Sequence, residues 1–141
     1  MARTPRVTRV TRVGINGFGR VGRLALRAGW GRNDLALVHV NEIKGGTGTG
    51  AHLLEFDSVH GRWAMPIASN EHNLAIDGRR LGWSDVSEPT DVDWEGLGVD
   101  VALECSGKFR TGSTLKPHLE RGGSAGPGGF GVRRALAAPA A

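Results

Sequence analysis

Residues 13–23 read VGINGFGRVGR, and this stretch decides the fold of the chain. It places the pattern GxGxxG at Gly17, Gly19 and Gly22, between an apolar strand and the start of a helix. In this pattern the first glycine permits a tight turn, the second lets a phosphate approach the backbone, and the third lets helix and strand pack closely. The stretch therefore predicts a loop that holds a pyrophosphate against a helix N-terminus.

The residues on either side of this loop predict a βαβ unit. Residues 10–16 form an apolar first strand, and residues 35–40 form the nearly continuous apolar run expected of a strand buried on both faces of a parallel sheet. Between them, a helical spacing places Arg23 and Arg27 on the solvated face, and the helix ends around residues 29–33. The apolar positions of that helix are Val21, Leu24, Ala25 and Ala28. This order predicts an α/β fold with a Rossmann-type, doubly wound, mostly parallel sheet.

The rest of the chain adds further strands and connections. Asp77-Gly78 stands between two apolar runs and predicts a β-hairpin with a two-residue turn. Other predicted elements are a flexible connection rich in glycine and threonine at residues 45–50, a short helix at 51–56, an extended segment at 62–67, a polar connection at 91–98 and an interior strand at 99–103. Residues 45–50 lack the Gly-Lys-Ser/Thr ending of a P-loop, which favours the flexible connection over a second phosphate loop.

Three strand ends are expected to converge on a ligand, because ligands of open α/β sheets bind outside the carboxyl ends of the strands. They are the glycine loop, Asn41-Glu42 and Ser106-Gly107. Glu42 lies 20 residues beyond Gly22, where a carboxylate accepts hydrogen bonds from the ribose of an adenine dinucleotide. A carboxylate repels a 2′-phosphate, so the pattern favours NAD over NADP, although Lys44 leaves the use of both cofactors open. The alternative is that Glu42 is only a polar residue at the start of a loop.

Length and composition describe a globular protein of one domain. The chain has 141 residues, of which 39% are hydrophobic and 23% charged, and this suffices for one core. No apolar run approaches the roughly 20 residues of a membrane span and no leader is recognisable, so we expect a cytoplasmic protein. The single cysteine, Cys105, excludes an internal disulfide, and we interpret it as a small buried hydrophobe and not as a nucleophile. The five histidines show no metal-ligand spacing, so no metal site is predicted.

Charge is segregated along the chain. Residues 1–32 carry eight arginines and no acid, residues 33–104 have a net charge of −9, and residues 105–141 have a net charge of +5. Basic ends attract nucleic acid, but no aromatic residues alternate with the arginines of residues 1–12, so a solvated tail is the favoured interpretation. A basic nucleic-acid-binding protein is the third-ranked hypothesis, after a free-standing NAD-binding module without catalysis.

Four segments together resemble the NAD-binding half of phosphorylating glyceraldehyde-3-phosphate dehydrogenases. They are residues 13–23, 40–42, 53–63 and 99–109, within a similarity that covers residues 7–121. The segment DSVHGR at residues 57–62 is the most specific, since general Rossmann domains do not carry it. The sequences of residues 41–45 and 51–63 are most similar to bacterial members encoded in arsenic-resistance operons, for which the resemblance implies arsenate in place of phosphate. Erythrose-4-phosphate dehydrogenases are a second group of relatives.

The resemblance implies roles for individual residues. Residues 16–19 would cradle the pyrophosphate together with the backbone N–H groups of Arg20 and Val21, and Glu42 stands where most of the family has aspartate. The segment VSEP at residues 86–89 holds no arginine where the family has one near the adenine. The predicted cofactor-binding residues are Asn16, Gly17, Phe18, Gly19, Arg20, Val21, Gly22, Asn41, Glu42, Ser106 and Gly107.

The resemblance also divides the chain. It implies a basic tail at residues 1–9, an NAD-binding domain at residues 10–121 and a divergent tail rich in glycine, alanine and proline at residues 122–141. The family's catalytic Ser-Cys-Thr-Thr-Asn segment and its partner histidine have no counterpart here, so no catalytic residue is predicted. A frameshift, a local insertion and a gene fragment each fit such an ending.

The lack of the strands that follow in the family predicts an uncovered sheet edge. Because total stability is only about 5–15 kcal/mol, we expect the isolated chain to aggregate, to bind NAD weakly or not at all, and to have no dehydrogenase activity. Family members are homotetramers, and the missing segments argue against the same assembly for this chain. The expected partner is thus NAD, not a membrane or a nucleic acid.

Overall fold

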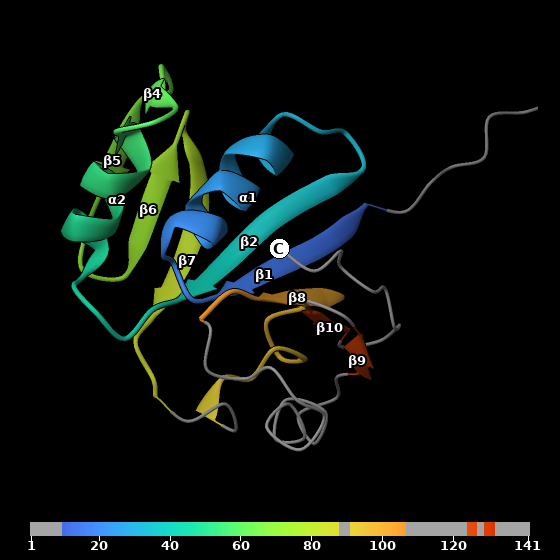
Figure 1. Cartoon of the computed structure of the whole chain (residues 1–141). Coiled ribbons are helices and arrows are strands. Elements are labelled where there is room, and N and C mark those ends of the chain that lie inside the picture. The colour runs from blue at the N-terminus through green and yellow to red at the C-terminus, as the bar shows by residue number, and fades with distance from the viewer. Residues whose placement is uncertain (1–9, 88–90, 107–123, 127–128, 132–141) are drawn as a thin grey trace, which may run out of the picture.

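The computed structural model describes residues 10–87, 91–106, 124–126 and 129–131. Its helices are α1 (Arg20–Trp30) and α2 (Thr47–Glu55). Its main sheet contains β1 (Thr11–Asn16), β2 (Leu35–Asn41), β5 (Ile67–Ser69), β6 (Asn73–Ile76), β7 (Arg79–Ser84), β8 (Val101–Glu104), β9 (Ser124–Gly126) and β10 (Gly129–Gly131). A separate small sheet pairs β3 (Phe56–Asp57) with β4 (Gly61–Arg62). In Figure 1, α1 lies across the strands β1 and β2, and α2 lies beside β5 and β6.

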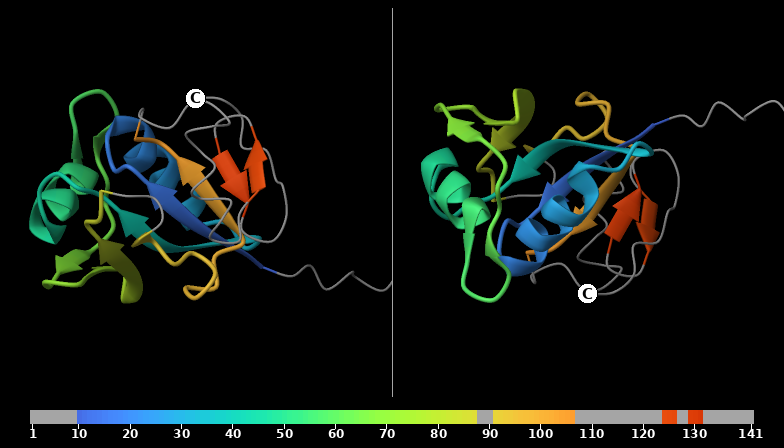
Figure 2. Two further views of the ribbon diagram at one scale, coloured as in Figure 1. Left: turned by 90° about the horizontal axis from the view of Figure 1, so that it is seen from below. Right: turned by 90° about the horizontal axis from the view of Figure 1, so that it is seen from above.

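The main sheet has a parallel centre and antiparallel edges. Its strand order is β5-β6-β7-β2-β1-β8-β10-β9, and the neighbours β7, β2, β1 and β8 run parallel. Antiparallel pairs flank this centre, β5 with β6 and β6 with β7 on one side, and β8 with β10 and β10 with β9 on the other (Figure 2). The predicted α/β fold of Rossmann type is confirmed, and its parallel strands bring their carboxyl ends to one edge of the sheet.

The hairpin predicted at Asp77-Gly78 is confirmed. It joins β6 to β7, and both turn residues have positive φ angles, 49° at Asp77 and 78° at Gly78. A type I′ turn needs positive φ at both central positions, which the dipeptide Asp-Gly adopts at low cost.

The face of α1 that packs on the sheet differs from the prediction. The buried residues are Gly22, Leu26, Gly29 and Trp30, whereas the predicted apolar position Val21 is 45% exposed. The periodicity of apolar side chains gave the wrong face because glycine adds nothing to a hydropathy count, yet it marks where a helix approaches its neighbours most closely. A Cβ atom on Gly29 would lie 3.1 Å from Leu37 Cδ2, so this side of the helix faces β2.

Arg23 and Arg27 of α1, predicted to lie on the solvated face, are half-buried. The guanidinium of Arg27 donates hydrogen bonds to the carbonyl oxygens of Leu54, Glu55 and Gly61 and lies 5.9 Å from the ring centroid of Trp63. It thereby satisfies carbonyls at the C-terminal end of α2 that have no partner within the helix. Arg23 Nη1 donates to the carbonyl of Phe18.

Residues 47–50 of the glycine- and threonine-rich segment are helical, so the prediction of a flexible connection at residues 45–50 is wrong there. Gly46 is the N-cap of α2, and Thr47 is its first residue, four positions before the predicted start. Gly50 is buried because it packs against the indole of Trp83. The extended segment predicted at residues 62–67 is strand only at its ends, in β4 and β5.

Apolar side chains form clusters on both faces of the sheet. The larger core lies between the sheet and the two helices and includes Ile15, Leu26, Leu54 and Leu81. The smaller contains Val92, Trp94, Val99 and Ala102. Residues 91–98 are therefore more than a polar connection, because Trp94 is fully buried and its ring fills the place that a Cβ on Gly14 would take, 2.5 Å away.

The edge beside β8 is paired, which corrects the expectation of an uncovered edge there. Antiparallel β10 pairs Gly129, Phe130 and Gly131 with Leu103, Ala102 and Val101, so the glycine-rich segment of the tail contributes to the sheet. On this side β9 forms the edge of the sheet, and weak NAD binding and aggregation stay predictions. Of the helices in the described part of the chain, none is both long and apolar enough to span a membrane.

Candidate functional site

An open pocket of about 220 Å³ lies at the carboxyl ends of β1, β2 and β8. Six predicted residues line it, namely Asn16, Gly17, Gly19, Asn41, Glu42 and Ser106. The other lining residues are Ile43, Lys44, Val86, Ser87 and Cys105. The structure thus brings together the three strand ends that the sequence singled out, and it adds the residues that follow β7.

The other predicted residues flank the pocket. Phe18 is 4% exposed and makes an edge-on ring contact with Trp83. Arg20 and Val21 are exposed at the start of α1, and Gly22 is buried beneath the loop. Gly107 lies outside the described residues, as do Glu88 and Pro89 of the segment where the family has an arginine. Val86 and Ser87 of that segment line the pocket.

The glycine loop depends on the absence of side chains at Gly17 and Gly22. Gly17 has a φ angle of +99°, and a Cβ there would lie 2.4 Å from the Ser106 nitrogen. A Cβ on Gly22 would lie 2.2 Å from the carbonyl oxygen of Gly17. At Gly19, the N-cap of α1, a Cβ would meet no atom within 4 Å, so this position borders open space above the helix N-terminus. The exposed N–H groups of such a terminus attract anions.

Glu42 holds the glycine loop as well as lining the pocket. Its Oε2 accepts a hydrogen bond from the Phe18 N–H and its Oε1 accepts one from the Lys44 N–H, 3.2 Å away. An ionised carboxylate has about four acceptor positions, so these two bonds leave capacity for ligand hydroxyls. The sequence pattern placed Glu42 at the pocket but did not reveal its contact with the loop.

Four polar side chains form a strand-end layer, defined as Ser84, Asn41, Asn16 and Glu104. The β-sheet register pairs Asn41 with Ser84 and pairs Asn16 with both Asn41 and Glu104. Hydrogen bonds run along the layer from Ser84 Oγ to Asn41 Oδ1 (2.7 Å), from Asn41 Nδ2 to Asn16 Oδ1 (2.9 Å) and from Asn16 Nδ2 to Glu104 Oε2 (2.8 Å). Sequence reasoning missed Ser84 and Glu104, although each is the last residue of a strand.

His39 extends this layer on the side away from Glu104. Its Nε2 lies 2.8 Å from Ser84 Oγ, and because the Ser84 hydroxyl hydrogen goes to Asn41, the imidazole is the donor. Burial, with a smaller contribution from the positive charge of Arg80, lowers the pKa of His39 to about 4. The imidazole is therefore neutral at pH 7 and acts as a hydrogen-bond donor within the fold.

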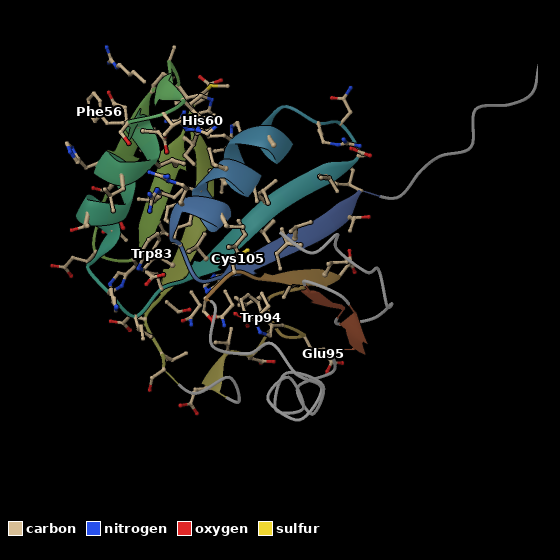
Figure 3. The ribbon with its side chains drawn as sticks, in the orientation of Figure 1. Phe56, His60, Trp83, Trp94, Glu95 and Cys105 are labelled. Atoms are coloured by element: carbon tan, nitrogen blue, oxygen red, sulfur yellow. The ribbon has the colours of Figure 1, made fainter. Side chains whose placement is uncertain are left out.

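Cys105 lines the pocket but is not a reactive thiolate. Burial, and to a lesser extent the nearby negative charge of Glu104, raise the pKa of its thiol to about 11. The side chain packs against the larger core, at the end of β8 beside the glycine loop (Figure 3). A nucleophilic cysteine has a lowered pKa, so the geometry agrees with the interpretation of Cys105 as a small apolar residue.

The segment at residues 57–62 lies away from the pocket. Figure 3 shows Phe56 and His60 near α2 and β4, at a distance from Cys105. Asp57 Oδ1 accepts hydrogen bonds from the N–H groups of His60 and Val59, which hold the pKa of this carboxyl well below its usual range. Glu55 and Arg62 form an ion pair with a separation of 2.9 Å. Within the described ranges, no group of three or more His, Cys, Asp and Glu side chains could hold a metal ion.

Comparison with known proteins agrees with this geometry. The family described as "Glyceraldehyde 3-phosphate dehydrogenase, NAD binding domain" matches residues 11–112. The chain is 59% identical over 111 residues to "Glyceraldehyde-3-phosphate dehydrogenase 3" of Nostoc sp. (strain PCC 7120), covering 79% of this chain and 33% of the relative. It is 39% identical over 114 residues to "Glyceraldehyde-3-phosphate dehydrogenase" of Pseudomonas aeruginosa, covering 79% and 34%.

A third relative leads to the same assignment. The chain is 39% identical over 111 residues to "Glyceraldehyde-3-phosphate dehydrogenase" of Geobacillus stearothermophilus, covering 79% of this chain and 33% of the relative. The chain therefore spans about a third of the length of the curated relatives that it matches. With a match over residues 11–112, the chain belongs to the family of glyceraldehyde 3-phosphate dehydrogenase NAD binding domains.

Proposed function

We propose that the strand-end pocket binds NAD. The observation that carries the proposal is the placement of the glycine loop, the N-terminus of α1 and the carboxylate of Glu42 around one cavity. The pyrophosphate would lie against Gly19 and the N–H groups of Arg20 and Val21, and the adenosine ribose would donate hydrogen bonds to Glu42. Asn16, Asn41 and Ser106 would line the pocket beneath the dinucleotide.

The residues present fit such a ligand. Gly19 leaves open space where a phosphate must approach the backbone. Glu42 keeps acceptor capacity beyond its bonds to Phe18 and Lys44. The pocket volume of about 220 Å³ lies below the roughly 300–1,000 Å³ of most small-molecule sites. A dinucleotide would therefore fill this pocket and extend past the glycine loop.

The charge at Glu42 supports a preference for NAD over NADP. A 2′-phosphate on the ribose would lie next to a carboxylate and would be repelled. The second candidate is use of both cofactors, which the placement of Lys44 in the same pocket favours, because its ammonium group would offset part of the repulsion.

The activity of the whole protein is a further proposal, supported by the printed names of the relatives. We propose that the whole protein oxidises glyceraldehyde-3-phosphate, with NAD as hydride acceptor and phosphate or arsenate as the co-substrate. In this proposal residues 10–121 supply the cofactor site. Cys105, the single cysteine of the chain, does not supply the nucleophile, because its raised pKa keeps it protonated.

Calorimetric titration of the full chain with NAD and with NADP tests the cofactor proposal. We expect NAD to bind about tenfold more tightly than NADP, which corresponds to about 1.4 kcal/mol. The variant Glu42→Gln retains an oxygen that can accept from Phe18 N–H but removes the charge, so the ratio should approach one. Absence of binding by both dinucleotides would overturn the proposed function, and equal affinities in the wild type would favour the second candidate.

A further inference from the structure

Glu104 lies between hydrogen-bond donors on both of its carboxylate oxygens. Oε2 accepts from Asn16 Nδ2 at 2.8 Å. Oε1 accepts from the Ser106 N–H at 2.9 Å and from the Ser106 hydroxyl at 2.5 Å. An ionised carboxylate only accepts hydrogen bonds, whereas an amide of the same shape has one oxygen and one NH₂ group. A glutamine at this position would therefore place two donors against each other on one side.

The donors cannot reorient to suit a glutamine. The backbone of Val86 fixes the amide of Asn41, since Val86 N–H donates to Asn41 Oδ1 at 3.0 Å and Asn41 Nδ2 donates to the Val86 carbonyl at 2.9 Å. Asn41 Nδ2 also donates to Asn16 Oδ1, which turns the Nδ2 group of Asn16 towards Glu104. On the other side, one of the two Ser106 donors is the backbone N–H, which can donate a hydrogen bond but cannot accept one. Residue 104 must therefore present a hydrogen-bond acceptor on each side, as the two oxygens of a carboxylate do.

Both partners of Glu104 border the glycine loop. Asn16 directly precedes Gly17, whose nitrogen donates to the carbonyl of Asn41 at 2.8 Å. Ser106 forms the wall against which Gly17 packs, because a Cβ on Gly17 would lie 2.4 Å from the Ser106 nitrogen and 2.7 Å from the Cys105 carbonyl carbon. Glu104 itself is absent from the residues that line the pocket. It therefore contacts the residues on both sides of the first turn of the loop without lining the pocket.

We propose that Glu104 is the positioning residue of the glycine loop, a role that rests on the proposed function for its effect on NAD. Its carboxylate holds Asn16 and Ser106 at the spacing that Gly17 needs. Glu42 provides the second hold, through the N–H of Phe18, the residue after Gly17. The two carboxylates, from the ends of β8 and β2, keep the loop in its binding conformation before any ligand arrives.

The test compares Glu104→Gln with Ser84→Ala in the full chain. Glu104→Gln should weaken NAD binding about tenfold and shift the backbone amide resonances of Gly17 and Gly19 in the ligand-free protein. Ser84→Ala removes a hydrogen bond to the Asn41 side chain at the opposite end of the same layer, whereas Gly17 contacts Asn41 through the backbone carbonyl. Ser84→Ala should lower the melting temperature by about as much as Glu104→Gln does. It should change NAD affinity by less than about twofold and leave the Gly17 resonance unshifted.

Amide resonances separate the positioning role from the cofactor proposal. If the wild type binds no NAD, the proposed function fails, and the Gly17 and Gly19 shifts still decide the role of Glu104. Unchanged shifts in Glu104→Gln, or equal losses of NAD affinity in both variants, would overturn the positioning role. Should Glu104→Gln not fold, Glu104→Asp keeps the charge but retracts the carboxylate by one methylene. It should then shift the same two resonances, and a wild-type spectrum would contradict the proposal.

Discussion

Two glycine-rich segments lie at the starts of α1 and α2, and glycine serves a different purpose in each. Residues 17–22 form the glycine loop and the first turn of α1; Gly17 has a positive φ angle, and a Cβ on Gly17 or Gly22 would strike backbone atoms. Residues 46–50 form the N-cap and first turn of α2, with helical backbone from Thr47 onward. Only Gly50 there is in close contact, with the ring of Trp83, while Gly46 and Gly48 border open space.

The difference shows what glycine content alone conveys. A glycine is required where backbone occupies the place of its Cβ, favoured where a held side chain such as Trp83 does, and only tolerated where solvent does. The loop therefore cannot vary at Gly17 and Gly22 without moving β1 or β8, whereas the helix start should improve when some of its glycines are replaced. Alanine substitutions along both segments test this contrast directly.

The largest effect is expected for Gly17→Ala. Its Cβ would combine a positive φ angle with contacts of 2.4 Å to Ser106 N and 2.5 Å to Ser106 Cα, so the substitution should destabilise the fold by about 3 kcal/mol or more. Urea unfolding followed by circular dichroism measures the loss. Gly31→Ala is the matched control, with a φ angle of −88° and no atom within 4 Å of its Cβ, and should change stability by less than about 1 kcal/mol. Equal stability of both variants would contradict the contrast.

The sequence predicted the βαβ unit, the Asp77-Gly78 hairpin and the convergence of three strand ends, because each has a local signal in turn residues or apolar runs. It did not predict the helical start at Thr47, since glycine lowers helix propensity and the packing of Gly50 on Trp83 is a tertiary contact. Nor could it predict the strand-end layer. That layer depends on which residues of separate strands lie in register, and no single segment of the chain contains this information.

The next largest effect is expected for Gly50→Ala. The new methyl group would lie 2.4 Å from Trp83 Cη2, and the ring cannot move freely because it contacts Phe18, with centroids 5.5 Å apart. Overpacking of about 1–3 kcal/mol exceeds the gain of about 1 kcal/mol in helix propensity, so a net loss follows. In a Trp83→Phe background the same substitution should become neutral or stabilising. Additive losses in the double variant, measured by urea unfolding, would contradict packing on Trp83 as the cause.

Gly19→Ala should separate ligand binding from folding. The position borders open space and has a φ angle of −74°, so alanine adds no clash, and stability should change by at most about 1 kcal/mol at this N-cap. The methyl group would, however, project into the pocket that Gly19 lines, and NAD binding should weaken about tenfold, or about 1.4 kcal/mol. Adenosine, which lacks the pyrophosphate, serves as the control ligand and should bind both proteins equally. NAD affinity equal to that of the wild type would argue against the phosphate approaching at Gly19.

The smallest effect, and the only gain, is expected for Gly48→Ala. Gly48 is exposed in the first turn of α2, and its Cβ would meet nothing within 4 Å. Alanine should raise the free energy of unfolding by about 0.5 kcal/mol, through higher helix propensity and a less flexible unfolded chain. Urea unfolding measures this gain as a higher midpoint. Gly46→Ala, at the N-cap, provides the internal comparison and should bring no gain, because glycine is preferred to alanine there. If Gly48→Ala instead destabilised the protein, the backbone at this position would not be helical. The helix would then begin nearer Ala51, and the contrast between the two glycine-rich segments would fail at its second member.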